Sequence, residues 1–127
     1  MNVENISNVL SIPFVKGYAQ QQYLSAEQGI ISAKEQKCEY WYIDGSIDSE
    51  MPHCWNKKRI NNLLKLIDFH NVSPIFHGNF KSPLASDVEE IRQAAVDYTK
   101  KEIDLACWLN APLQKELIGH WIYFLRS

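Results

Sequence analysis

The stretch SPIFHGNFKSPLASD, residues 73–87, decides the fold when it is read with the helical pattern that follows it. Residues 72–76 contain the β-branched and aromatic side chains Val72, Ile75 and Phe76, which are typical of a strand, although Pro74 lies among them. His77-Gly78-Asn79 follows as a turn at the carboxyl end of that strand. After a loop, Asp87 to Leu109 has apolar residues at helical spacing. The stretch therefore predicts a strand, a loop and a long helix.

The long helix has a predicted start, a predicted end and a predicted buried side. Ser86 and Glu89 have the spacing of a capping box, in which each side chain satisfies a free N–H group of the first turn. Asn110-Ala111-Pro112 ends the helix, because proline cannot continue it. The residues that we expect on the buried side are Ile91, Ala95, Tyr98, Ile103, Ala106 and Leu109.

A helix and a strand of the same kind precede this stretch. Ser25 and Gln28 form another predicted capping box, and we expect a helix from Ser25 to Gln36. Cys38 to Ile43 is aromatic and β-branched, and it ends at the turn Asp44-Gly45-Ser46, so it predicts a strand.

The remaining elements are one more helix and two terminal strands. A helix is predicted from Asn56 to His70, with Asn71 as its C-cap. Its buried side is predicted at Ile60, Leu63, Leu64 and Ile67. Val9 to Val15 predicts an edge strand or a strand end, because a proline interrupts it. Leu117 to Leu125 predicts a buried strand, and a terminal helix is the alternative.

Strands and helices therefore alternate along the chain, which predicts the α/β class. With 127 residues, of which 46% are hydrophobic, the chain is long enough for one domain with its own core. We expect a single domain over residues 1–127, built as a partial (β/α) barrel-like parallel sheet of about four strands with three main helices.

Charge and composition exclude several classes of protein. Thirteen basic and fifteen acidic residues give a net charge of −2, so there is no electrostatic reason to expect nucleic acid. No stretch has the ~18 apolar residues of a membrane span, and no secretory signal pattern begins the sequence. Cys38, Cys54 and Cys107 are an odd, widely spaced set, which fits reduced thiols. We therefore expect a soluble, cytoplasmic protein.

Two predicted strand ends carry polar side chains, and ligands of parallel α/β sheets bind at such ends. His77 could bind a metal or a sugar hydroxyl, with Gly78 allowing close approach; a histidine that only caps the strand is the alternative. Asp44 could bind a hydroxyl or a divalent cation, although an Asp-Gly turn explains it without function. Asn79 completes the predicted ligand-binding set.

Other histidines and cysteines are weaker candidates. His53 and Cys54 could join His77 around a soft metal, but adjacent side chains rarely chelate one ion well. His120 lies in an apolar run and His70 at a helix end, so we expect both to be structural.

Residues 73–111 resemble the sugar phosphate isomerase/epimerase family, whose members are TIM barrels of the xylose isomerase-like type. The shared features are a strand ending in His-Gly-Asn-Phe, a Leu-Ala-Ser loop, and a long helix with Ile-Arg near its start and Asp-Leu-Ala near its end. The resemblance implies a sugar as ligand and a divalent metal as cofactor. It places His77 and Asp44 at strand ends where the family binds its ligands.

A complete barrel needs about 250 residues, and this chain provides 127. The family's later strands, which supply most of its metal ligands, have no counterpart in these residues. Two functions are therefore open. The first is a truncated domain with an interaction or vestigial role, which assembles as a homodimer or with a protein partner to cover its sheet. The alternative is a metal-dependent sugar or sugar phosphate isomerase or epimerase whose site is completed by oligomerisation.

Overall fold

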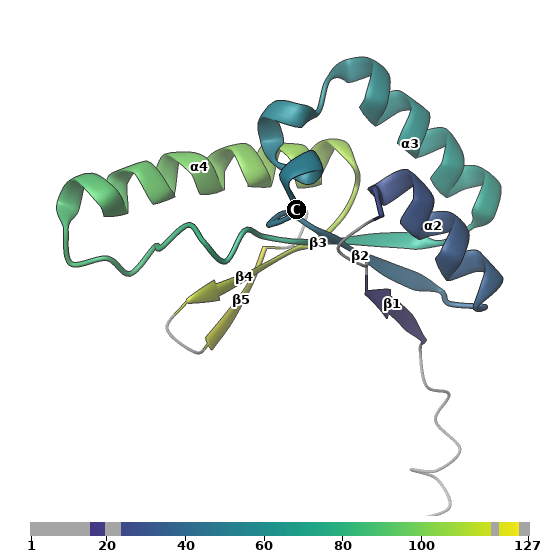
Figure 1. Ribbon diagram of the computed structural model, residues 1–127, viewed down its shortest axis with the longest axis horizontal. Coiled ribbons are helices and arrows are strands. Elements are labelled where there is room, and N and C mark those ends of the chain that lie inside the picture. The colour runs from purple at the N-terminus through teal and green to yellow at the C-terminus, as the bar shows by residue number, and fades with distance from the viewer. Residues whose placement is uncertain (1–15, 20–23, 118–119, 125–127) are drawn as a thin grey trace, which may run out of the picture.

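The computed structural model describes residues 16–19, 24–117 and 120–124, and Figure 1 shows how their elements are arranged. The helices are α2 (Ala26–Glu35), α3 (Lys57–His70) and α4 (Glu89–Trp108). The strands are β1 (Gly17–Ala19), β2 (Tyr40–Asp44), β3 (Ser73–His77), β4 (Leu113–Leu117) and β5 (His120–Phe124). Two short 3-10 helices, η1 (Asp48–Glu50) and η2 (Pro52–Cys54), lie between β2 and α3. The strand expected at residues 9–15 lies outside the described residues.

The strands form one sheet in the order β1-β2-β3-β4-β5, and the first four run parallel. This confirms the predicted parallel sheet of about four strands with three helices. β2 and β3 pair along their whole length, so that Asp44 lies opposite His77. β4 pairs with β3 only through Leu113 and Gln114, and it therefore extends past the carboxyl end of β3. Such a stagger between neighbouring strands is typical of barrels.

The last part of the sheet is a hairpin. The strand expected at Leu117–Leu125 is present as β5, at His120–Phe124. β4 is an element that the apolar pattern does not predict, because polar residues occupy its middle. β5 runs antiparallel beside β4, and so it lies at the edge where the next parallel strand of a barrel would pair.

The first two predicted helices begin and end as their sequences indicate. In the capping box of α2, the Ser25 hydroxyl accepts from the Gln28 N–H at 3.3 Å, and Gln28 Oε1 accepts from the Ser25 N–H at 3.0 Å. The Asn56 side chain caps α3 by accepting from the Arg59 N–H at 2.8 Å. Asn71 ends α3 with a left-handed backbone, at φ 53°.

The start and the buried side of α4 differ from the prediction. The capping box of Ser86 and Glu89 is wrong: α4 begins without a side-chain cap, and the Ser86 hydroxyl instead accepts from the Val88 N–H at 3.2 Å. Ile91 is 47% exposed because the amino-terminal half of α4 extends beyond the strands (Figure 1). The residues of α4 that are buried are Ala95, Thr99, Glu102, Leu105 and Ala106.

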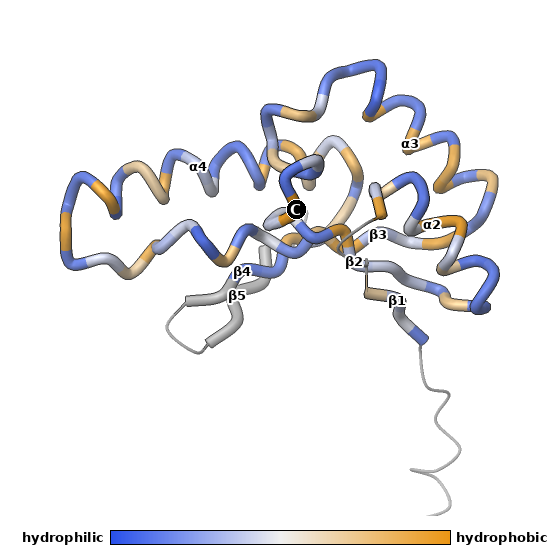
Figure 2. Tube along the Cα trace, in the orientation of Figure 1, coloured by the Kyte–Doolittle hydropathy of each residue, from blue (hydrophilic) through white to orange (hydrophobic). Residues whose placement is uncertain are grey.

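The helices and the sheet form two layers. In Figure 1, α2, α3 and α4 all lie on one side of the sheet. Trp41, Ile43 and Phe76 are fully buried on that side, in the hydrophobic core. Figure 2 shows hydrophobic and hydrophilic positions alternating along α3 and α4, as expected of helices that cover a core on one side only.

The other side of the sheet carries the residues that alternate with the core positions. Its members are Tyr40, Tyr42, Asp44, Ser73, Ile75, His77 and Gln114. We call this side the open face, because no helix in the described part of the chain covers it. Nor is any helix among the described residues long and apolar enough to cross a membrane.

Candidate functional site

Three polar side chains lie in a row at the carboxyl edge of the open face. The register of β2, β3 and β4 places Asp44 opposite His77 and His77 opposite Gln114. His77 Nδ1 is 3.9 Å from Asp44 Oδ1, and the two side chains are 23% and 34% exposed. His77 and Asp44 are both predicted from the sequence as ligand contacts, and the structure brings them together.

Hydrogen bonds of the turn after Asp44 hold the carboxyl ends of β2 and β3 together. Asp44 Oδ1 accepts from the N–H and the hydroxyl of Ser46, at 2.9 and 2.6 Å, so the structural role expected of an Asp-Gly turn is present. The Gly45 N–H donates to the His77 carbonyl at 2.7 Å. A β-carbon on Gly45 would lie 2.9 Å from the His77 carbonyl oxygen and 2.9 Å from the Phe76 ring, which is closer than real side chains pack. Glycine is therefore required where the two strand ends meet.

Gln114 is the member of the row that no sequence pattern predicts. It is only 9% exposed, and its Oε1 atom is buried with no hydrogen-bond partner among the described residues. A buried oxygen without a donor costs about 1–3 kcal/mol, so a native protein rarely retains one without a reason. It lies beside His77 in the register of β3 and β4, and it is the third member of the row.

Asn79 has a different place from the one expected for a ligand contact. It is 5% exposed, and its side chain is used within the loop that follows β3. Its Oδ1 atom accepts from the Lys81 N–H at 3.0 Å, and its Nδ2 atom donates to the Tyr98 hydroxyl at 3.3 Å. A role for Asn79 in binding a ligand remains a prediction.

A buried ion pair lies behind this loop, between α4 and β4. Lys115 Nζ is 2.7 Å from Glu102 Oε1, and both side chains are fully buried. Burial raises the pKa of Glu102 above its ordinary value, and the hydrogen bonds from Lys115 and from the Asn79 N–H offset part of that rise. Hydrophobic patterning cannot detect such a pair. The sequence signal for the burial of Glu102 is its spacing. It lies three residues after Thr99 and four before Ala106, and so it shares their buried face of α4.

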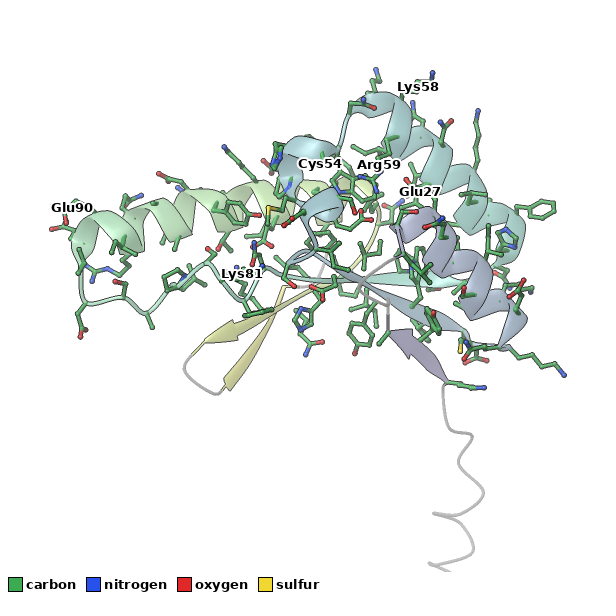
Figure 3. The ribbon with its side chains drawn as sticks, viewed as in Figure 1. Glu27, Cys54, Lys58, Arg59, Lys81 and Glu90 are labelled. Atoms are coloured by element: carbon green, nitrogen blue, oxygen red, sulfur yellow. The ribbon has the colours of Figure 1, made fainter. Side chains whose placement is uncertain are left out.

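A second charged cluster joins α3 to α2 and supports the helical layer. Figure 3 shows Arg59 of α3 and Glu27 of α2 close together, and Arg59 Nε is 2.7 Å from Glu27 Oε1. Arg59 also pairs with fully buried Glu50, and its guanidinium lies 3.8 Å from the centre of the Trp55 ring. Partial burial raises the pKa of Glu27, but the hydrogen bonds and charge of Arg59 outweigh it and hold that pKa below its ordinary value. This cluster is structural.

Among the described residues, His53, Cys54 and His77 do not converge as the predicted soft-metal group. His53 is exposed, and Cys54 Sγ donates to the Asp48 carbonyl at 3.2 Å. His70 packs edge-on against Phe69 at the end of α3, with ring centres 5.0 Å apart. The side chain of His120 lies outside the described part of the structure.

The divalent metal that the resemblance implies does not fit the described residues by themselves. Among residues 16–19, 24–117 and 120–124, no three His, Cys, Asp or Glu side chains converge as a metal site would require. Asp44 and His77 supply two candidate ligands at the carboxyl edge. His77 as a metal ligand therefore remains a prediction.

Comparison with known proteins gives a structural match. No protein-family model matches the sequence, and no curated protein matches it. Solved structures do match, and one of them is described as the crystal structure of a D-tagatose 3-epimerase-like protein. The TM-score is 0.60 and the sequence identity 22%, over 75% of this chain and 34% of the other. The described chain therefore has the fold of part of a xylose isomerase-like TIM barrel, as the resemblance of residues 73–111 predicts.

Proposed function

We propose that the chain is one part of a barrel-like assembly that binds a small sugar at the carboxyl edge of its sheet. We propose further that a second copy of the chain covers the open face. The observation that carries the proposal is the row of Asp44, His77 and Gln114, which three neighbouring strands place in register on the open face. Such convergence of polar side chains at strand ends is where α/β proteins bind their ligands.

The need for a cover follows from the kind of sheet. Parallel sheets occur almost only with both faces covered, and here the described helices cover one face. The open face includes the aromatic residues Tyr40 and Tyr42 together with Ile75, which gain by leaving water. Because β5 already pairs with the outer edge of β4, the cover is expected to pack on the face rather than to extend the sheet at that edge.

A sugar suits the chemistry of the row. A carboxylate and an amide oxygen accept from hydroxyl groups, and an imidazole can donate or accept. Tyr42 lies edge-on to His77, with ring centres 6.5 Å apart, and adds an aromatic surface for the apolar side of a sugar ring. The epimerase-like name of the matched structure supports a ketose such as D-tagatose as the first probe.

Isomerase or epimerase chemistry is the second candidate function, and the proximity of Asp44 and His77 favours it. Moving a proton next to a carbonyl needs a general base within hydrogen-bond reach, which either group provides. The groups that polarise the carbonyl oxygen would then come from the covering copy. We place the assembly in the cytoplasm, where a reducing environment keeps the three free cysteines as thiols.

The test of the proposed function is a titration of the purified chain with D-tagatose, followed by calorimetry or by NMR. We expect saturable binding in the unaltered chain and a loss of affinity of about tenfold in His77→Ala, since a buried ligand hydroxyl left without its hydrogen-bond partner costs ~1–3 kcal/mol. His53→Ala is the matched control, because His53 is an exposed histidine outside the row. Equal binding by the two variants, or none by the unaltered chain, would refute the proposal.

A further inference from the structure

The backbone of a single loop residue is bound on both sides by the buried ion pair. Glu102 Oε2 accepts from the Asn79 N–H at 2.6 Å, and Lys115 Nζ donates to the Asn79 carbonyl at 2.8 Å. The two side chains also pair with each other at 2.7 Å. Carboxylate, ammonium and the Asn79 peptide groups thus form a closed hydrogen-bonded set that joins α4, β4 and the loop after β3.

A buried ion pair stabilises a core less than hydrophobic residues of the same volume often would. Removing two charges from water costs more than their attraction usually returns, and well-packed hydrophobic residues of similar volume are often as stable or more stable. Glu102 and Lys115 are both fully buried, and their neighbours Leu105, Ala106 and Leu113 belong to the hydrophobic core. A hydrophobic pair would satisfy the packing here, but it could not bond to the N–H and carbonyl groups of Asn79.

The fixed residue lies two positions after His77. Between them, the Gly78 N–H donates to the Gln114 carbonyl at 2.7 Å. A β-carbon on Gly78 would lie 2.7 Å from Lys115 Cδ, so the backbone passes directly over the lysine side chain. The His77 end of β3 is therefore held by β2 on one side, through the Gly45 N–H, and by the ion pair on the other.

We propose that Glu102 and Lys115 are positioning residues, which hold the Gly78-Asn79 turn and thereby fix His77 in the row with Asp44 and Gln114. The pair acts through the backbone and touches no ligand. This inference rests on the proposed function, because it assigns a purpose to the placement of His77. It explains why charged residues occupy a layer that hydrophobic residues would fill at lower cost.

Two double variants separate positioning from simple packing. Glu102→Leu with Lys115→Met removes both charges and both hydrogen bonds from the pair to the Asn79 backbone, while it keeps a filled, apolar core. Glu102→Gln with Lys115→Gln removes both charges but keeps one acceptor and one donor for the Asn79 backbone. An exposed pair on the same helix, Asp97 with Lys100 at 3.9 Å, gives the control variant Asp97→Ala with Lys100→Ala.

The readouts are the imidazole NMR signals of His77, the melting temperature and the affinity for D-tagatose. We expect the Leu/Met variant to melt close to the unaltered chain, to show shifted or multiple His77 signals, and to bind D-tagatose at least tenfold more weakly. We expect the Gln/Gln variant to keep a single His77 environment and an affinity within about threefold. A folded Leu/Met variant with unchanged His77 signals and unchanged affinity would overturn the proposal.

One measurement on the unaltered chain keeps the proposal testable if the Leu/Met variant does not fold. We expect the Asn79 amide hydrogen to exchange as slowly as the paired amides of β3, and exchange as fast as in an exposed loop would overturn the proposal. Failure of the proposed function is distinguishable from failure of this inference. If the unaltered chain does not bind D-tagatose, the His77 signals of the two variants still show whether the pair positions that residue.

Discussion

Gly78 and Lys115 are packed so closely that a β-carbon at position 78 would lie 2.7 Å from Lys115 Cδ. The Gln114 carbonyl oxygen would be 3.2 Å from the same β-carbon, and backbone cannot move aside as a side chain can. The contact links the turn after His77 to the buried layer behind it. The carboxyl edge of the sheet therefore depends on a glycine in the turn after β3 and on a lysine in β4.

The first prediction follows from this contact. Gly78→Ala should lower the free energy of unfolding by about 1–3 kcal/mol, because overpacking forces neighbouring atoms to shift. Gly17→Ala is the matched control, since a β-carbon on Gly17 would meet no atom within 4 Å. Urea unfolding followed by circular dichroism measures both variants. Equal stability of the two would show that the turn is looser than described.

The second prediction concerns single substitutions in the buried ion pair. Glu102→Ala and Lys115→Ala should each lower the free energy of unfolding by about 3–5 kcal/mol, because each leaves an uncompensated buried charge. The exposed pair of Asp97 and Lys100 on α4 should behave differently. Asp97→Ala should change the free energy of unfolding by less than about 1 kcal/mol. A loss below about 1 kcal/mol in both buried variants would contradict the burial of the pair.

The third prediction is a pH dependence that comes from Glu27. Arg59 holds the pKa of Glu27 below its ordinary value of 4.5, despite the opposing effect of partial burial. The ionised form is therefore favoured in the folded chain. This contribution to stability is complete above the ordinary pKa and is lost as the pH falls through the lowered pKa. Glu27→Gln should thus reduce the loss of stability between neutral and acidic pH, as followed by thermal melting across that range. An unchanged pH profile would contradict the assignment.

The fourth prediction concerns Gln114. Gln114→Leu should raise the free energy of unfolding by about 1 kcal/mol, because it removes a buried oxygen that has no donor among the described residues. The same substitution should weaken binding of D-tagatose, because it removes an acceptor from the row. Opposite changes in stability and in affinity are expected of a residue retained for function. A variant that loses stability and keeps its affinity would show that Gln114 is only structural.

Much of the fold is predictable from local patterns. The capping box of Ser25 and Gln28 and the left-handed Asn71 depend on neighbours a few residues away, and both are present as their sequences indicate. The same local signal at Ser86 and Glu89 fails, because α4 begins without a side-chain cap. β4 is different, because Lys115 is stabilised by Glu102 on a helix thirteen residues earlier in the chain. A polar strand of this kind has no local signal.

The candidate site is predictable to a similar extent. His77 and Asp44 are identifiable because each ends a strand rich in aromatic and β-branched residues and precedes a turn. Gln114 is not identifiable in this way, because it lies within a strand that the pattern does not predict. The place of Asn79 also depends on tertiary contacts, since its backbone is bound by Glu102 and Lys115.

The most direct test of the central claim is the mass of the purified chain in solution, measured by light scattering at about micromolar to hundred-micromolar concentration. If a second copy covers the open face, the mass should be twice the 14.7 kDa of one chain. Tyr42→Glu, which places a charge on that face, should return the mass to that of a single chain. A single-chain mass for the unaltered protein at the highest concentration would contradict the account.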